Sequence, residues 1–373
     1  REAFEAARSA GDRHAAIFYL RLLSAEEQPE LEAWLALDRG ESEQAAEWYL
    51  KAIELHPRKA GLHLALGHLL REQGNGEEAL ARYLQAIELD PPLSLQIHYE
   101  LPPEAAIPCL RKAVEIYPGN LDLYQTLAPL LEASGAMDDA IALLRSAPRS
   151  PTQETSPVDI HSQLGDLLLR SGRPEEALAS FQTACDLNPR NIPRLAELQA
   201  WFGREQELTA TWQRLRALSE TGGAEPGRKT HAALACCLRI SATPAELNEA
   251  RSLAQQGFKE MNVPWTLMVL GIAEYRTGDY VPAADTLQRA AEKSAGGGWE
   301  WIQCCTNFYR AMALFQQGKL EGAQTIARTA LAQMTPLPED ADRPSALNTG
   351  DLHAWLAYKQ AKALFDFETP TAR

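Results

Sequence analysis

Two stretches of the sequence share one pattern without a gap. Residues 62–91 read LHLALGHLLREQGNGEEALARYLQAIELDP, and residues 160–189 read IHSQLGDLLLRSGRPEEALASFQTACDLNP. A pattern that recurs in fixed register indicates an internal repeat, and a repeat decides the fold before any other feature does. The shared positions are Leu66, Gly67, Leu70, Gly74, Ala79, Tyr83, Ala86 and Pro91 in the first stretch, and Leu164, Gly165, Leu168, Gly172, Ala177, Phe181, Ala184 and Pro189 in the second.

The residue types predict two helices in each repeat. Apolar residues recur at intervals of three and four in each half, which is typical of an amphipathic helix. Gly67 and Ala79 are small, so we expect the two helices to approach closely there. Gly74 and Gly172 are expected to end the first helix in a left-handed conformation, and Pro91 stops the second helix.

The pattern continues on both sides of these stretches. One unit ends at Pro57, and the unit that ends at Pro118 is too short for a full first helix, with Pro102 and Pro103 in the gap. More units lie around residues 127–147, 270–287 and 311–330, with degenerate units at 192–218 and 229–260 and a partial unit at 1–24. The spacing therefore predicts about eight to nine helical pairs.

The repeat resembles the tetratricopeptide repeat (TPR) at all eight positions given above. This resemblance implies an all-α fold, a right-handed α–α superhelix or TPR solenoid. Because the end of a solenoid has to be covered, we expect a capping helix at residues 351–367. We expect an N-terminal array over residues 1–218, with the first helix of the unit near 92–118 shortened, and a C-terminal array over residues 229–334. Ser219–Lys229, which is rich in glycine, is a possible hinge between the arrays.

Charge and composition exclude several classes of partner. The chain has 50 acidic and 36 basic residues and a net charge of −14, so it repels nucleic-acid phosphate and anionic lipid. Its apolar stretches are far shorter than the roughly 20 residues of a membrane span. Six cysteines are too few for a disulfide scaffold and predict a cytoplasmic protein. Because the chain begins with Arg1, we expect a piece of a longer protein.

The sequence contains no arrangement of residues that predicts catalysis. It lacks a G-x-S-x-G motif and a phosphate-binding loop, and its eight histidines are scattered. Adjacent cysteines, as at Cys236-Cys237 and Cys304-Cys305, point in different directions on a helix and make poor chelates. We therefore predict a non-enzymatic scaffold without cofactor or metal, whose partner is a protein or peptide.

From about residue 230 the chain also resembles the C-terminal TPR region of bacterial serine/threonine protein kinases of the planctomycete and verrucomicrobial type. The matching stretches are Ala235–Leu238, Pro264-Trp265, Leu270–Tyr280, Ala311–Leu314 and Gly350–Ala357. The kinase motifs themselves, such as H-R-D and D-F-G, are absent. The resemblance implies a kinase domain before Arg1, and the alternative is the TPR region of another multidomain system, such as a glycosyltransferase or an assembly factor.

Families of this kind turn the first helix of each pair toward an inner groove. In the C-terminal units the groove positions are apolar, which predicts a surface for an apolar peptide or helix. The predicted groove consists of Trp265, Met268, Ile272, Tyr275, Phe308, Met312 and Phe315. In the N-terminal units the groove positions include Glu30, Asp159 and Asp166, which predicts attraction of a basic end of the peptide. The other interpretation of the apolar positions is core, covered by Asp351–Phe367.

Overall fold

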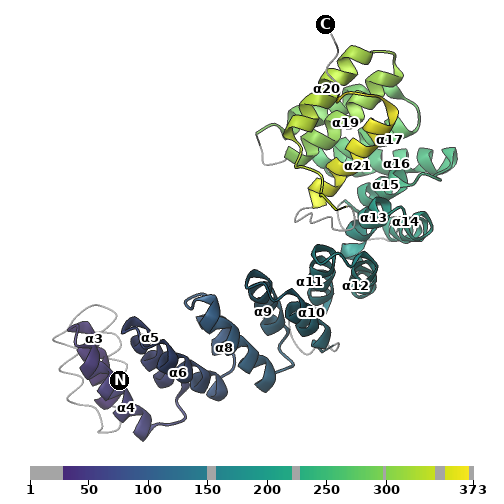
Figure 1. Ribbon diagram of the computed structural model, residues 1–373. Coiled ribbons are helices and arrows are strands. Elements are labelled where there is room, and N and C mark those ends of the chain that lie inside the picture. Colours follow the sequence, from purple (N-terminus) through teal and green to yellow (C-terminus); the bar gives the residue numbers. More distant parts are fainter. Residues whose placement is uncertain (1–27, 149–156, 221–226, 297–299, 341–348, 369–373) are drawn as a thin grey trace. The chain divides into compact units, whose positions relative to one another are not determined.

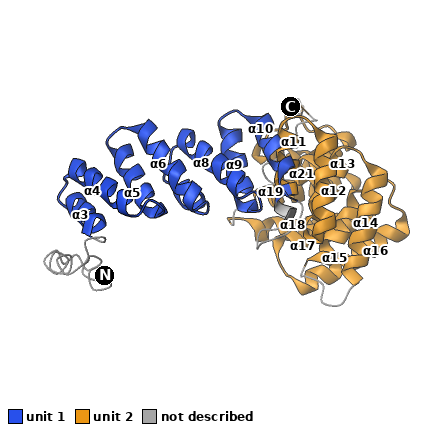
Figure 2. Ribbon diagram, turned by 90° about the horizontal axis from the view of Figure 1, so that it is seen from below, with its two compact units in different colours: residues 1–160 blue, residues 161–373 orange. Residues whose placement is uncertain are grey.

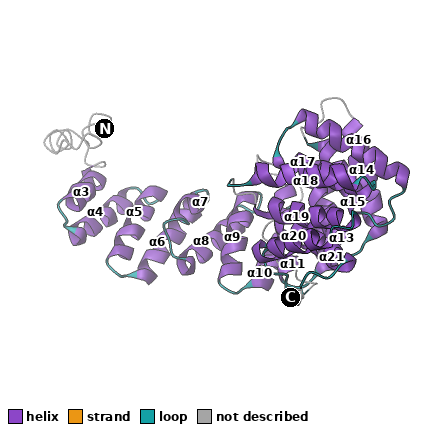
Figure 3. Cartoon of the chain, turned by 90° about the horizontal axis from the view of Figure 1, so that it is seen from above, coloured by secondary structure: helices purple, strands orange, loops and turns teal. Residues whose placement is uncertain are grey.

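Every regular element in the described part of the chain is a helix. The computed structural model describes residues 28–148, 157–220, 227–296, 300–340 and 349–368. Over these ranges it has 19 α-helices and one short 3-10 helix, and no strand (Figure 3). Consecutive helices pack in pairs, so the predicted all-α repeat fold is confirmed. The partial repeat predicted at residues 1–24 lies outside the described residues.

The chain divides into two compact units, residues 1–160 and 161–373 (Figure 2). The described part of unit 1 contains four consecutive helical pairs (Figure 1). They are α3 (Gln28–Asp38) with α4 (Ser42–Leu55), α5 (Ala60–Glu72) with α6 (Gly76–Leu89), α7 (Leu93–Ile97) with α8 (Pro103–Ile116), and α9 (Leu121–Ala133) with α10 (Met137–Ser146). Helix α7 has only five residues. The boundary between the units falls within α11 (Pro157–Arg170).

The small residues of the repeat allow the helices of a pair to touch. A Cβ atom on Gly67 would lie 2.7 Å from the ring of Tyr83, and one on Gly165 would lie 2.7 Å from the ring of Phe181. In both repeats an aromatic ring of the second helix therefore packs directly on the backbone of the first. The expectation that Gly67 marks a close approach is confirmed.

The turns within the pairs use glycine in the way the repeat predicts. Gly74 has a φ of 84° and Gly172 a φ of 74°, both in the left-handed region that a side chain disfavours. After Gly74 the backbone N–H of Asn75 donates to the carbonyl of Leu70, at 2.9 Å, so an unpaired carbonyl at the end of α5 is satisfied. This closure fixes where the next helix starts.

Unit 2 repeats the same pairing and adds one helix. Its elements after α11 are α12 (Pro174–Leu187), the 3-10 helix η1 (Pro189–Asn191), α13 (Ile192–Trp201), α14 (Glu205–Glu220), α15 (Arg228–Leu238), α16 (Pro244–Glu260), α17 (Pro264–Arg276), α18 (Tyr280–Ser294), α19 (Glu300–Gln316), α20 (Leu320–Gln333) and α21 (Thr349–Leu364). The boundary that we expected between two arrays, near residues 219–229, lies inside this unit. Helices α14 and α15 pack against each other on its two sides.

The first helices of the pairs in unit 2 form one layer. Helices α13, α15, α17 and α19 pack side by side, and we call them the inner layer. Helix α21 packs against α19 and also against α13, which belongs to a much earlier pair. The C-terminal helix thus lies along the inner layer, where it covers several repeats and not only the last one.

Candidate functional site

The structure places the seven predicted groove residues of unit 2 beneath other parts of the chain. Four are at most 1% exposed, and three are only partly buried. The four buried residues are Met268, Ile272, Phe308 and Met312, and the three partly buried ones are Trp265, Tyr275 and Phe315. All seven lie on α17 and α19 of the inner layer, as their spacing predicted.

The segment that covers α19 is α21 with the residues just after it. The Phe308 ring centroid lies 5.8 Å from that of Tyr358 and 6.0 Å from that of Phe367. Phe315 stacks on Phe365, with centroids 4.9 Å apart and planes 11° apart. Sequence analysis left groove and core as alternatives at these positions, and the structure supports core. An open peptide groove along residues 265–315 is therefore wrong for this structure.

The first half of helix α21 is buried on almost every side. Residues Leu352 to Tyr358 form an unbroken buried run, which is unusual for a helix at a surface. The indole N–H of Trp355 donates to the carbonyl of Thr335, at 2.9 Å. A Cβ atom on Gly350 would lie 2.3 Å from the ring of Trp301, so only glycine lets the helix start this close to α19. These contacts make α21 an internal element of unit 2.

A buried polar pair joins α21 to α13. The Nε2 atom of His353 lies 3.2 Å from Oε1 of Glu197, outside good hydrogen-bond geometry, and both side chains are 6% exposed. Burial raises the pKa of Glu197, and the charges of His353 and Arg194 act against that rise. Burial, with repulsion from His353, lowers the pKa of nearby His231 to about 4. Sequence reasoning missed this pair, because its members lie on a degenerate repeat and on the predicted cap.

The thiols in the described part of the chain are all free and buried. Burial raises the pKa of Cys236 and Cys304 to about 11 and of Cys237 to about 12, so the thiols stay protonated and unreactive. No group of three or more His, Cys, Asp or Glu side chains in the described ranges is placed to hold a metal ion. No described helix is long and apolar enough to span a membrane.

The inner positions of unit 1 have a different environment. Counted back from the glycine that ends the helix, Leu64 of α5 corresponds to Met268 and Phe308 in unit 2. Leu64, His68 and Arg71 of α5 are all partly exposed. In the described part of unit 1 every helix belongs to a pair, and none packs on this face as α21 does in unit 2.

The short helix α7 adds polar and aromatic groups to this face. The turn after α7 brings Glu100 next to α5, and the preceding residue, Tyr99, is 85% exposed. Arg71 donates to the Glu100 carbonyl, and Nε2 of His68 lies 3.5 Å from Oε2 of Glu100. Burial lowers the pKa of His68, although Glu100 acts to raise it. We call Leu64, His68, Arg71, Tyr99 and Glu100 the α5–α7 face.

Two of the acids expected to attract a basic peptide end are already neutralised. Glu30 forms an ion pair with Lys59, and Asp166 forms one with Arg194. The side chain of Asp159 lies outside the described residues. Fixed charge at these inner positions is therefore smaller than the acidic sequence suggested.

Comparison with protein families identifies the repeat. Models described as TPR repeat or tetratricopeptide repeat match residues 36–74, 62–95, 103–156, 158–191 and 308–329. These residues form tetratricopeptide repeats. TPR repeats indicate a scaffold for protein–protein interaction, and proteins of this kind bind proteins or peptides. The matched models describe the tetratricopeptide repeat in general and do not mention a kinase. Comparison with curated proteins gave no match.

Solved structures that match this chain include TPR proteins, all at low identity. The C-terminal part of a TPR repeat-containing protein from Cytophaga hutchinsonii is 13% identical, with a TM-score of 0.41, over 65% of this chain and 99% of that one. The P58(IPK) TPR domain is 16% identical, with a TM-score of 0.26, over 97% and 96%. The structure of Naa15/Naa10 bound to HypK-THB is 13% identical, with a TM-score of 0.36. It covers 89% of this chain, which spans only 63% of that relative.

Proposed function

We propose that this TPR protein is a scaffold that binds a partner protein or peptide on the α5–α7 face of unit 1. The observation that carries the proposal is the contrast at corresponding positions. Phe308 of unit 2 is fully buried under the chain's own C-terminal segment, whereas Leu64 of unit 1 is partly exposed. An inner TPR position that none of the described helices covers is available to a partner.

The chemistry of the α5–α7 face suits a peptide with apolar and polar groups. Tyr99 offers a large ring with few rotatable bonds, which contributes contact area at low entropic cost. Arg71 and Glu100 offer a fixed guanidinium and a carboxylate that is 60% exposed, and both can pair with polar groups of a peptide. The partner therefore needs an apolar anchor for Leu64 and Tyr99 and hydrogen-bonding groups beside it.

Peptide selection can test this site. Peptides from a phage-displayed library selected on the purified protein should bind the variant carrying Arg71→Ala and Tyr99→Ala at least tenfold more weakly than the wild type. The control is Leu55→Ala, which removes an exposed side chain of α4, 48% exposed, outside this face. Selected peptides that bind all three proteins equally would place the interaction elsewhere.

We further propose, on the sequence resemblance of residues 230–357 alone, that the array accompanies a bacterial serine/threonine protein kinase in a longer chain. A glycosyltransferase or an assembly factor is the alternative. The sequence that precedes Arg1 in the full protein tests this: kinase motifs there would support the proposal, and a different domain would overturn it. The cytoplasmic location expected from the cysteines is also a proposal, and fractionation of the expressing cells would test it.

A further inference from the structure

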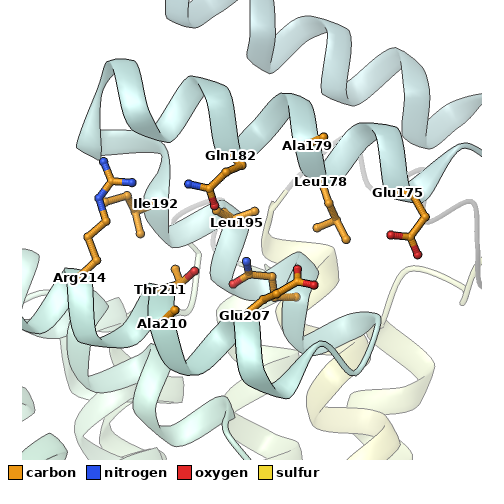
Figure 4. Close-up of a pocket in the computed structure, with 11 residues that line it drawn as sticks. Glu175, Leu178, Ala179, Gln182, Ile192, Leu195, Glu207, Ala210, Thr211 and Arg214 are labelled. Carbon is orange, nitrogen blue, oxygen red and sulfur yellow. The ribbon is translucent and has the colours of Figure 1, made fainter.

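Unit 2 has a groove on the side of its second helices. Its walls are α12 and α14, its floor is α13, and its volume is about 490 Å³. Figure 4 shows Glu175 of α12 and Glu207 of α14 extending into the gap from opposite sides, with Arg214 at the other end. Leu178, Ile192 and other apolar residues line the space between these charged ends.

Unit 1 has a corresponding groove over α5, between α4 and α6, with a volume of about 320 Å³. The two grooves are built from the same repeat positions, counted from the glycine that ends each floor helix. The corresponding residues in unit 1 and unit 2 are Leu66 and Leu195, Leu70 and Gln199, Glu78 and Glu207, and Ala81 and Ala210. At these shared positions the floors differ once, where unit 1 has leucine and unit 2 has glutamine, and the walls differ where Arg82 and Gln85 of unit 1 correspond to Thr211 and Arg214 of unit 2.

Gln199 is a buried amide in a position that suits leucine. The residue is 3% exposed, and its Oε1 atom has no hydrogen-bond partner among the described residues. The same position holds a buried leucine in three other repeats, at Leu70, Leu131 and Leu168, and it holds Ala36 and the buried Glu274 in two more. Burying an amide without a hydrogen-bond partner lowers the stability of the fold, whereas burying a leucine at the same position does not. Because Gln199 belongs to the groove floor, a ligand in the groove can supply the missing hydrogen bond.

The charges around the groove leave one carboxylate unmatched. Glu175 pairs with Arg204, and Arg214 pairs with Asp186. Glu207 is exposed, and no hydrogen bond or ion pair engages its carboxylate within the described ranges. The groove thus combines an unpaired anion, an unpaired amide and an apolar wall.

We propose that this groove binds a basic segment of a partner protein. The methylene stem of a lysine lies on Leu178 and Ile192, its ammonium group pairs with Glu207, and a peptide amide of the segment hydrogen-bonds to Gln199. A long side chain with a charged end matches a wall that is apolar along its length and acidic at its edge. This site is distinct from the α5–α7 face and does not depend on it.

Titration with short blocked peptides, followed by nuclear magnetic resonance, tests the proposal. Acetyl-Ala-Lys-Ala-amide should shift the side-chain amide resonances of Gln199 along a saturable curve. The matched peptide with norleucine in place of lysine keeps the stem without the charge and should bind at least tenfold more weakly. No saturable shift at millimolar lysine peptide, or equal binding of the two peptides, would overturn the proposal.

Variants in the two corresponding grooves provide the controls. Gln199→Leu should abolish binding of the lysine peptide while the unfolding temperature stays the same or rises, since it replaces an unpaired buried amide by the leucine found at this position in three other repeats. Glu207→Gln, at an exposed position, tests the site independently of folding and should weaken binding at least tenfold. Glu78→Gln makes the same change in unit 1 and should have no effect. Wild-type binding by both unit 2 variants would overturn the proposal. The α5–α7 face variants should bind this peptide normally, which separates the two sites.

Discussion

The inner faces of units 1 and 2 are built from the same repeat and end in different environments. Leu64 and Phe308 occupy one repeat position, yet Leu64 is partly exposed and Phe308 is completely buried. The difference comes from α21, which follows the last pair of unit 2 and lies along its inner layer. A repeat position therefore defines which way a side chain points, and the rest of the chain decides whether that side chain is surface or core.

Deleting residues 349–373 is the strongest test of this comparison, because it removes the helix that covers the inner layer of unit 2. Each large apolar side chain that α21 buries, such as Leu352, Trp355 and Phe365, contributes about 1.5–3 kcal/mol. We expect the deletion to destabilise unit 2 by on the order of 10 kcal/mol, an upper estimate because the unfolded chain already buries some surface. Hydrogen exchange should show loss of protection in α17 and α19.

Unit 1 is the internal control for that deletion. Protection in α5 and α6 should be unchanged, and a synthetic peptide of residues 349–368 should restore protection in α17 and α19 when added in excess. If the truncated chain kept full protection in α19, α21 would be a dispensable cover and the two faces would differ only in sequence.

A matched pair of alanine substitutions tests the same contrast one residue at a time. Phe308→Ala removes a buried ring and should cost about 3–5 kcal/mol of unfolding free energy. Leu64→Ala, at the same repeat position of unit 1, should cost less than about 1 kcal/mol, because its side chain is partly exposed. Urea unfolding measures both. Equal costs would mean that Leu64 is as well packed as Phe308.

Acid should weaken unit 2 more than unit 1. The folded pKa of His231, about 4, lies below the ordinary 6.5, so its neutral form stabilises the fold above pH 6.5 and that contribution is lost as the pH falls toward 4. We expect a loss of about 1–2 kcal/mol between pH 7 and pH 5, because the ring keeps some contact with solvent. Unfolding followed by hydrogen exchange in α15 measures it.

Two variants separate the contributions to that pH dependence. His231→Gln should remove most of the loss. Glu197→Gln should make the loss larger. Because the pKa of Glu197 is raised, acidification protonates this buried carboxylate and removes the cost of its charge, which stabilises the fold and partly offsets the effect of His231. A loss of the same size in His231→Gln would assign the pH dependence to other groups.

The smallest effect concerns what the two units share. Gly67→Ala places a Cβ atom against Tyr83, and Gly271→Ala places one 2.5 Å from Leu287. Overpacking costs about 1–3 kcal/mol, and the gain in helix propensity returns about 1 kcal/mol, so each variant should lose about 1 kcal/mol. Thermal unfolding measures the loss. A much larger cost in one unit would show that the pairs, and not only their covering, differ.

The helical pairs followed from the sequence because their contacts are local. Gly67 meets Tyr83 and Gly74 closes the turn within one repeat, so a window of about 30 residues contains every partner. Sequence analysis left the cover of α19 by residues 351–367 as one of two alternatives. The contact of α21 with α13 did not follow, because α13 is far away in sequence and belongs to a repeat whose pattern has degenerated. Nothing local in the run Leu352–Tyr358 distinguishes an end cap from a helix inside the inner layer.

The candidate sites were harder to predict for the same reason. The α5–α7 face depends on the turn after the short helix α7, where Tyr99 and Glu100 follow no repeat pattern. Gln199 was missed because residues 192–218 looked degenerate. One sign was present: aligning Gly203 with Gly74, Gly135 and Gly172 puts glutamine where those three repeats have leucine. A deviation at an otherwise apolar floor position is the feature to look for in such arrays.

The placement of α21 sets an order of events during synthesis of the chain. In unit 1 each pair meets its neighbours as soon as they leave the ribosome, so this region can fold progressively as it emerges. In unit 2 the rings of Phe308 and Phe315 pack on Tyr358 and Phe365, which are translated only after α20. Until α21 is made, the inner layer exposes an apolar surface, and we expect chaperones to bind the nascent chain mainly during that interval.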